Sequence, residues 1–94
     1  MQYHWLNKQN NDKLVIFFAG WSFDYKPFEF LACDDFDVLM MYDYSIYPCP
    51  LSEGGFANLC DGYKKTYLVA WSMGVFAAYL LKENLPKFNK KIAI

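Results

Sequence analysis

The stretch YLVAWSMGVFAAYLL, residues 67–81, decides the fold, because it runs an apolar strand pattern straight into an apolar helix pattern. It predicts a strand over Thr66–Trp71 and the strongest helix of the chain over Met73–Asn84. Ser72 stands at the hinge between them. Where a strand of an open α/β sheet turns sharply into a helix, the turn residue is exposed at the carboxyl end of the sheet, where such sheets bind ligands. Ser72 is therefore a candidate functional residue.

The predicted helix carries two kinds of apolar side chain. Its bulky residues follow the i, i+3, i+4 spacing of one helix face: Val75, Phe76, Tyr79 and Leu80. Its small residues, Ala77 and Ala78, permit a close approach to a sheet. This pattern is typical of a helix that packs on the strand preceding it.

Further strands and short helices are predicted around this unit. Continuous apolar runs of the kind found in buried parallel strands occupy Leu14–Ala19 and Val38–Tyr42, and another strand begins in KIAI, residues 91–94. Short helices are predicted over residues 22–32 and Phe56–Cys60. The alternation of strands and helices predicts an α/β fold with a mostly parallel sheet and flanking helices.

Composition and charge exclude several classes of protein. The formal net charge is −1, so the charge balance does not suggest nucleic acid or an anionic membrane as a partner. The late lysines are interpreted as a solvated helix end and loop: Lys82, Lys87, Lys90 and Lys91. No apolar run is long enough to span a bilayer. The start, MQYHWLNKQNNDK, lacks the apolar core of a secretory signal, and residues 7–13 within it are predicted to form a turn.

The three cysteines, Cys33, Cys49 and Cys60, are odd in number and far apart, and none forms a CxxC pair. A disulfide or zinc framework is therefore not expected. We expect a cytoplasmic protein in which these thiols are buried or inert rather than nucleophilic.

Small residues flank Ser72 two positions away on either side. Ala70 and Gly74 give the pattern G-x-S-x-G with alanine in place of the first glycine. With a strand before it and a helix after it, this pattern is typical of a nucleophile elbow, because larger side chains there would collide with the neighbouring strand and helix. The alternative is that Ser72 only caps the N-terminus of the helix.

The segment FFAGWS places Gly20 and Trp21 directly after the first predicted strand. An acyl-transfer enzyme needs N–H donors where the oxyanion develops. In an elbow enzyme one donor is the residue after the nucleophile, here Met73, and the other comes from the loop after an earlier strand, here Trp21. The alternative for Gly20 and Trp21 is a tight turn with an aromatic lid on the core.

The segments VIFFAGWSFD, residues 15–24, and YLVAWSMGVFAAYLL resemble the α/β-hydrolase fold. Within it they are most similar to the BioG-type pimeloyl-acyl-carrier-protein methyl ester esterases of biotin synthesis. The resemblance implies that Ser72 is the nucleophile and that the N–H groups of Trp21 and Met73 form the oxyanion hole. It also implies that the side chains of Trp21 and Trp71 line the acyl pocket. The implied substrate is an ester linked to acyl carrier protein, and neither a cofactor nor a metal is implied.

Two positions depart from the broader hydrolase pattern. Ala19 stands where many members have a histidine before the glycine, and Ala70 replaces the first glycine of the elbow. Both residues are small, so we expect the geometry of the two turns to be preserved.

The groups that would activate Ser72 are not found after it in the sequence. The triad order in this fold is serine, then an acid, then histidine. The residues after Ser72 include no aspartate or histidine, and their one acid, Glu83, lies within the predicted helix. The one histidine, His4, precedes the serine and is interpreted as a solvated or strand-flanking residue. We therefore expect residues 1–94 to be a single incomplete α/β-hydrolase domain, its N-terminal half, with almost no esterase activity alone.

A non-enzymatic alternative follows from the same observation. A truncated remnant of a hydrolase could persist as an interaction module or self-associate through an open sheet edge.

Other acidic residues are weaker candidates. CDDFD contains three acids, Asp34, Asp35 and Asp37, but lacks the glycine and terminal glutamate of a calcium loop, so a polar loop is predicted. Asp43 follows a strand as the ribose-binding acid of a dinucleotide fold would, but AGWSFD lacks the GxGxxG phosphate cradle.

Overall fold

The computed structural model describes residues 2–20, 25–31, 35–43, 55–80, 85 and 87–93, which build one five-stranded sheet with helices on both faces. The elements are, in chain order, β1 (Gln2–Asn7), β2 (Lys13–Phe18), the 3-10 helix η1 (Lys26–Leu31), β3 (Asp37–Tyr42), α1 (Gly55–Cys60), β4 (Lys65–Ala70), α2 (Met73–Leu80) and β5 (Lys90–Ala93). None of the helices in these ranges is long and apolar enough to cross a membrane.

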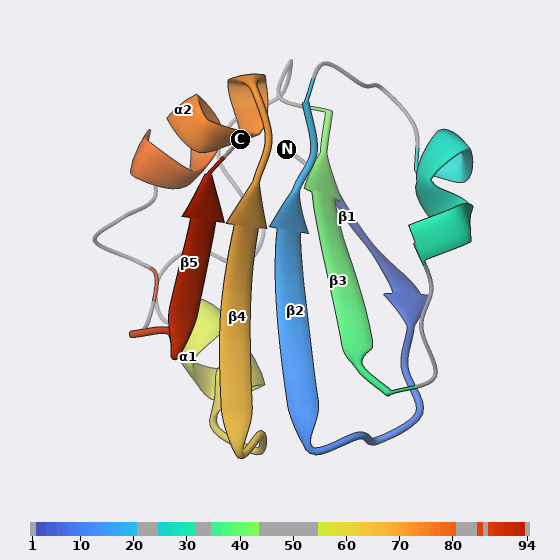
Figure 1. The fold of residues 1–94 in the computed structure, drawn as a ribbon, viewed down its shortest axis with the longest axis vertical. Coiled ribbons are helices and arrows are strands. Elements are labelled where there is room, and N and C mark those ends of the chain that lie inside the picture. The colour runs from blue at the N-terminus through green and yellow to red at the C-terminus, as the bar shows by residue number, and fades with distance from the viewer. Residues whose placement is uncertain are drawn as a thin grey trace.

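The sheet has the order β1-β3-β2-β4-β5 and is mostly parallel, as predicted (Figure 1). β2 lies at its centre and pairs in parallel with β3 on one side and β4 on the other, and β5 pairs in parallel with β4. The predicted strands and short helices are all present with their bounds moved by a few residues. The predicted end of the long helix, residues 81–84, lies outside the described residues.

One strand, β1, is missing from the predictions. It runs antiparallel to β3 at the sheet edge, and Gln2 lies opposite Tyr42. Its side chains are only partly buried, so they do not produce the continuous apolar run that marked the inner strands. Pairing with β3 holds it in place, together with hydrogen bonds from Tyr42 Oη to Gln2 Oε1 (3.2 Å) and from Gln2 Nε2 to Asp43 Oδ2 (3.0 Å).

The two faces of the central strands belong to two apolar clusters. On the face covered by α1 and α2, side chains of β2, β3 and β4 pack against Phe56, Cys60 and the alanines of α2. On the opposite face, Phe17 and Met40 pack against Phe28 of η1 and against Tyr25, the residue before η1. Burial on both faces explains why β2 and β3 are continuous apolar runs in the sequence.

The side of α2 that faces the sheet carries its small residues. Gly74, Ala77 and Ala78 are buried, whereas the bulky residues of the predicted apolar face are all exposed: Val75, Phe76, Tyr79 and Leu80. The prediction that the alanines permit close approach is confirmed, and the bulky stripe does not form the core contact. Because the helix lies close against the end of β2, only small side chains fit between them.

The prediction of a polar loop at CDDFD is wrong for Asp37, which begins β3 and is completely buried. Its carboxylate accepts hydrogen bonds from the N–H of Gln9 (2.9 Å), the N–H of Asn11 (3.3 Å), the side-chain amide of Asn11 (3.0 Å) and the hydroxyl of Tyr63 (2.5 Å). A buried carboxylate is tolerated when donors surround it in this way. Asp35 is exposed in the turn before β3, and Asp34 lies outside the described residues.

Candidate active site

Ser72 lies at the carboxyl end of the sheet, between the end of β4 and the first residue of α2. It is exposed, and its backbone adopts a left-handed conformation with φ of 55°. Such a conformation costs a non-glycine residue roughly 1–3 kcal/mol and is concentrated at functional sites. The turn is held by hydrogen bonds from Trp71 N to the Phe18 oxygen (3.1 Å) and from Val75 N to the Ser72 oxygen (3.0 Å).

This geometry differs from that of a helix cap. An N-cap residue has extended backbone angles, and its side-chain oxygen accepts a hydrogen bond from an N–H of the first helical turn. Ser72 has a left-handed backbone, and its side chain makes no hydrogen bond within the described part of the chain. Ser72 therefore does not serve as a conventional N-cap.

The two small residues around Ser72 allow the turn to pack tightly. Ala70 is buried and lies opposite Phe18 in the neighbouring strand. Gly74 faces the end of β2: a methyl group on it would lie 2.5 Å from the carbonyl oxygen of Ala19 and closer still to that of Phe18. Real Cβ atoms essentially never approach other atoms to less than 3.0 Å, so a side chain at position 74 would force the helix away from the strand.

Trp71 lies over the loop that follows β2. The six-membered part of its indole covers Gly20, and a Cβ added to Gly20 would meet Trp71 Cε3 at 3.2 Å. On η1, the ring of Phe28 contacts Trp71 edge-on, with 6.1 Å between centroids, and also contacts Phe17 at 5.8 Å. Trp71 remains 43% exposed, so it presents an aromatic surface next to Ser72.

Phe28 was not among the residues predicted to belong to the site. In the sequence it is only one apolar position of a short predicted helix, and nothing there links it to Trp71. Its contact depends on the long-range placement of η1 against the carboxyl end of β2 and β4.

Of the two predicted oxyanion donors, the structure describes one. Met73 is the first residue of α2 and is exposed, and the first N–H groups of a helix have no acceptor within the helix. Its N–H is therefore available beside Ser72. Trp21 lies outside the described residues.

No acid or histidine of the described residues is hydrogen-bonded to Ser72. His4 lies on β1, which is separated from β4 by β3 and β2, and its ring stacks on Tyr25 with 3.5 Å between centroids. Asp43 is buried after β3, and its carboxylate accepts a hydrogen bond from the Gln2 side chain. Glu83 lies outside the described residues.

The described residues offer no group of three or more histidine, cysteine, aspartate or glutamate side chains that could hold a metal. Cys60 is a buried free thiol, and burial raises its pKa to about 11, so the thiol is protonated at neutral pH. That is the inert behaviour expected for it. Cys33 and Cys49 lie outside the described residues.

The contact between Gly20 and Trp71 leads to a prediction. Gly20→Ala is expected to displace the indole by a few tenths of an ångström, because the added methyl group would lie 3.2 Å from Trp71 Cε3, which is closer than an ordinary van der Waals contact. In a Trp5→Phe, Trp21→Phe background, the emission maximum of Trp71 should shift in Gly20→Ala and remain unchanged in Gly62→Ala, where a Cβ would meet nothing within 4 Å. An unchanged Trp71 spectrum in Gly20→Ala would contradict the packing described here.

Comparison with known proteins shows the family of the chain. Residues 1–90 match the family model described as pimeloyl-ACP methyl esterase BioG. The chain has the fold of the crystal structure of BioG from Haemophilus influenzae, with a TM-score of 0.72 and 24% identity over 99% of this chain and 40% of that one. It is also 39% identical over 82 residues to a malonyl-[acyl-carrier protein] O-methyltransferase of Bacteroides fragilis, covering 85% of this chain and 15% of that protein. The chain thus spans less than half the length of either relative, and by the family match it belongs to the BioG family.

Proposed function

We propose that this chain supplies the nucleophile-bearing part of a serine carboxyl-ester hydrolase that acts on pimeloyl-[acyl-carrier protein] methyl ester in biotin biosynthesis. The observation that carries the proposal is Ser72, exposed with a left-handed backbone between β4 and α2 in a chain of the BioG family. In this proposal residues 1–94 are the N-terminal half of one α/β-hydrolase domain. The family supports a substrate linked to acyl carrier protein.

The proposed reaction begins when Ser72 Oγ attacks the ester carbonyl carbon and loses its proton to a general base. The carbonyl oxygen becomes an oxyanion, which accepts hydrogen bonds from the N–H groups of Met73 and Trp21. The tetrahedral intermediate collapses, the bond to the methoxy oxygen breaks, and methanol leaves with a proton. Water then attacks the acyl-enzyme, which releases the carboxylate and restores the Ser72 hydroxyl. No step calls for a cofactor.

The side chains of Trp71 and Trp21 are proposed to line the acyl pocket. The exposed face of Trp71 next to Ser72 supports this role. The indole ring is kept in position by its contacts with Gly20 and Phe28. A flat aromatic surface suits an aliphatic acyl chain, because it buries apolar area without offering competing hydrogen bonds. The cytoplasm is proposed as the compartment, on the spacing of the cysteines in the sequence.

The test is the hydrolysis of methyl pimeloyl-[acyl-carrier protein] by the protein isolated from its own cell, with its intact mass determined in the same preparation. Replacing Ser72 with alanine or with glycine is expected to lower the rate by at least about a thousandfold, because both variants lack the nucleophile. Ser72→Gly is the control for folding, since glycine adopts the left-handed conformation without strain. Full activity in a folded Ser72→Gly protein would refute the proposal.

The 94-residue chain by itself is expected to hydrolyse a short-chain nitrophenyl ester at close to the background rate. A serine hydroxyl is a weak nucleophile without a base, and no acid or histidine of the described residues is hydrogen-bonded to Ser72. The second candidate function, a catalytically inactive interaction module, is favoured by this same observation. Turnover by the isolated chain that disappears in Ser72→Ala would exclude that second candidate.

A further inference from the structure

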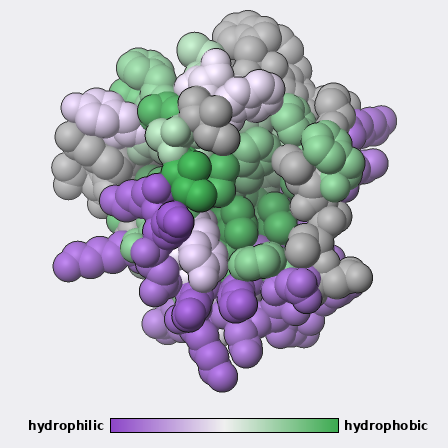
Figure 2. Space-filling model, in the orientation of Figure 1, coloured by the Kyte–Doolittle hydropathy of each residue, from purple (hydrophilic) through white to green (hydrophobic). Residues whose placement is uncertain are grey.

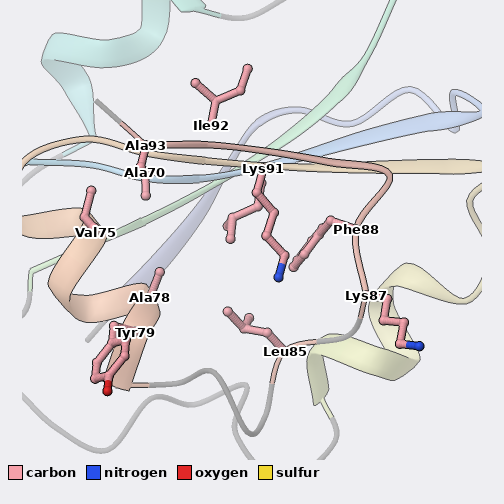
Figure 3. A pocket seen from close by; sticks show the side chains of 11 residues that line it. Ala70, Val75, Ala78, Tyr79, Leu85, Lys87, Phe88, Lys91, Ile92 and Ala93 are labelled. Atoms are coloured by element: carbon pink, nitrogen blue, oxygen red, sulfur yellow. The ribbon is translucent and has the colours of Figure 1, made fainter.

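The two faces of the sheet differ beside the candidate nucleophile. On the face covered by α1 and α2, an open groove of about 460 Å³ lies between α2 and β5 (Figure 3). Side chains of Ala70, Val75 and Tyr79 line it. Within the described part of the chain, neither Ser72 nor Trp71 is among its lining residues. An acyl chain that lies on the indole of Trp71 therefore does not run in this groove.

The indole of Trp71 lies on the opposite face, at the carboxyl end of the sheet. Side chains alternate along β4, so Ala70 packs in the cluster under α2, whereas Val69 packs in the cluster on the η1 face. Trp71 follows the direction of Val69, since its ring contacts Phe28 of η1. An acyl chain that leaves Ser72 along this indole therefore runs toward η1.

The other end of the sheet is unsuited to an aliphatic chain. Figure 2 shows hydrophilic side chains gathered at the lower end of the molecule, where β2 and β4 begin in Figure 1, and apolar ones above them. Lys13 and Lys65, the first residues of these strands, are exposed, as is Lys64. The end of the sheet that carries Ser72 is therefore the better match to an apolar substrate.

The helix η1 is fixed to the sheet through two aromatic residues. Tyr25, the residue before it, stacks on His4 of β1 with 3.5 Å between ring centroids and meets the ring of Tyr42 of β3 edge-on at 6.0 Å. Phe28 contacts Phe17 of β2 edge-on at 5.8 Å, and its N–H donates a hydrogen bond to the Tyr25 oxygen (2.9 Å). Phe17 is itself buried. The position of the Phe28 ring is therefore set by contacts with β1, β2 and β3.

The ring of Phe28 in turn holds the indole of Trp71. The two ring planes meet at 71° with 6.1 Å between centroids, which is the edge-to-face arrangement that aromatic pairs prefer. The indole also lies against Gly20, which leaves room for it because glycine has no side chain. A half-exposed tryptophan side chain has several staggered rotamers, and these two contacts select one of them. Without the Phe28 ring, the indole could turn away from its place beside Ser72.

We infer that Phe28 is a positioning residue that gives the site a preference for long aliphatic acyl groups. Its ring holds the indole of Trp71 so that the flat face of the indole lies beside the acyl chain of an ester bound at Ser72. Phe28 acts through Trp71, and the acyl chain extends over the η1 face of the sheet and not into the groove beside Tyr79. The inference rests on the proposed function, because it names the part of the substrate that this site selects.

The experiment measures kcat and KM of the protein purified from its own cell for nitrophenyl octanoate and nitrophenyl acetate. Phe28→Leu is expected to lower the ratio of kcat/KM for octanoate to that for acetate by about threefold to tenfold, because only the longer chain reaches the indole. The change should lie in KM for octanoate, with kcat altered by less than about twofold, since the ground state and the transition state share this contact. A loss of folded protein would instead lower kcat for both esters equally.

Further variants separate positioning from a general effect on structure. Phe30→Leu, on the same helix at a ring that is 78% exposed, should leave the ratio unchanged. Trp71→Leu should lower the ratio at least as much as Phe28→Leu. Adding Phe28→Leu to Trp71→Leu should then change the ratio by less than about twofold, because Phe28 has no indole left to hold. Phe28→Met, a second apolar replacement, is measured beside Phe28→Leu so that the test does not depend on the folding of one variant.

The outcomes distinguish a failure of this inference from a failure of the proposed function. A ratio that is unchanged in folded Phe28→Leu and Phe28→Met, while Ser72→Gly abolishes both activities, would overturn the role of Phe28 and leave the proposed function standing. An equal effect of Phe28→Leu with and without Trp71 would also overturn that role, since Phe28 would then act by another route. Octanoate hydrolysis that persists in folded Ser72→Gly would refute the proposed function and, with it, the selectivity assigned to Phe28.

Discussion

Replacing Gly74 with alanine is expected to lower the free energy of unfolding by about 3 kcal/mol or more, which is the upper end of the overpacking range. The added methyl group would lie 2.5 Å from the carbonyl oxygen of Ala19 and closer still to that of Phe18. Both atoms belong to the backbone at the end of the central strand, so neither can move aside as a flexible side chain could. The helix must therefore shift, which opens the packing of Ala77 and Ala78 against the core.

Urea denaturation followed by far-ultraviolet circular dichroism measures this loss. Gly62→Ala is the matched control, since Gly62 is exposed and a Cβ there would meet nothing within 4 Å. The control should change the unfolding free energy by no more than about 0.5 kcal/mol. Equal transition midpoints for Gly74→Ala and the unmutated chain would mean that α2 does not lie against β2 as described.

The strand-turn-helix unit around Ser72 could be predicted from the sequence because its small residues stand at fixed positions two before and two after the serine. A small residue at position 74 is required by the backbone at the end of β2, and this requirement leaves a short pattern in the sequence although the contact itself is long-range. The inner strands β2 and β3 were predictable for a similar reason, since burial on both faces produces continuous apolar runs.

The features that could not be predicted depend on contacts between distant parts of the chain. β1 is stabilised by pairing with β3, and its half-buried side chains give no strong periodicity. The bulky stripe of α2 has the spacing of a core-facing surface, but the close approach at Gly74 turns that stripe outward. At the candidate site, the support of Trp71 by Phe28 depends on where η1 packs, which no local pattern records.

The hydrogen-bond network of Asp37, at the amino end of the sheet, is another feature that the sequence does not predict. In the sequence Asp37 is one of three acids in a polar stretch and has no property that separates it from Asp35. In the fold it is completely buried, and its donors come from the turn after β1 and from Tyr63, which precedes β4. Because the residues of this network come from three separate segments, they form no motif of fixed spacing in the sequence. It joins β3, the turn after β1 and the segment before β4, so its removal should affect the whole sheet.

Asp37→Ala is expected to lower the free energy of unfolding by about 3 kcal/mol, because it leaves several buried donors without an acceptor. Tyr63→Phe removes one of these hydrogen bonds and should cost about half as much. Asp35→Ala is the control, since Asp35 is exposed in the adjacent turn, and it should change stability by less than about 0.5 kcal/mol. The urea midpoints of the three variants measure these losses of stability and show whether they follow the expected order. If Asp35→Ala and Asp37→Ala are equally mild, the network does not hold the sheet.

The same network makes stability depend on pH at both extremes. Burial raises the pKa of Asp37, but the hydrogen bonds from Tyr63, Gln9 and Asn11 outweigh it and hold the pKa below its ordinary value of 3.8. The contribution of Asp37 is therefore present above about pH 4 and is lost as the pH falls through the folded-state pKa. Burial, the hydrogen bond to Asp37 and nearby negative charge raise the pKa of Tyr63 well above its usual range.

Because folded Tyr63 holds its proton more tightly than unfolded Tyr63, its contribution is complete below about pH 10 and declines as the pH rises above that value. Thermal unfolding from pH 3 to pH 11 should therefore show an acid decline that Asp37→Ala reduces and an alkaline decline that Tyr63→Phe reduces. Asp37→Ala should also reduce the alkaline decline, and Tyr63→Phe should also reduce the acid decline. The reason is that the hydrogen bond between the two side chains contributes to both pKa shifts. If stability falls by the same amount at high pH in Tyr63→Phe as in the unmutated chain, ionisation of Tyr63 does not cause the alkaline decline.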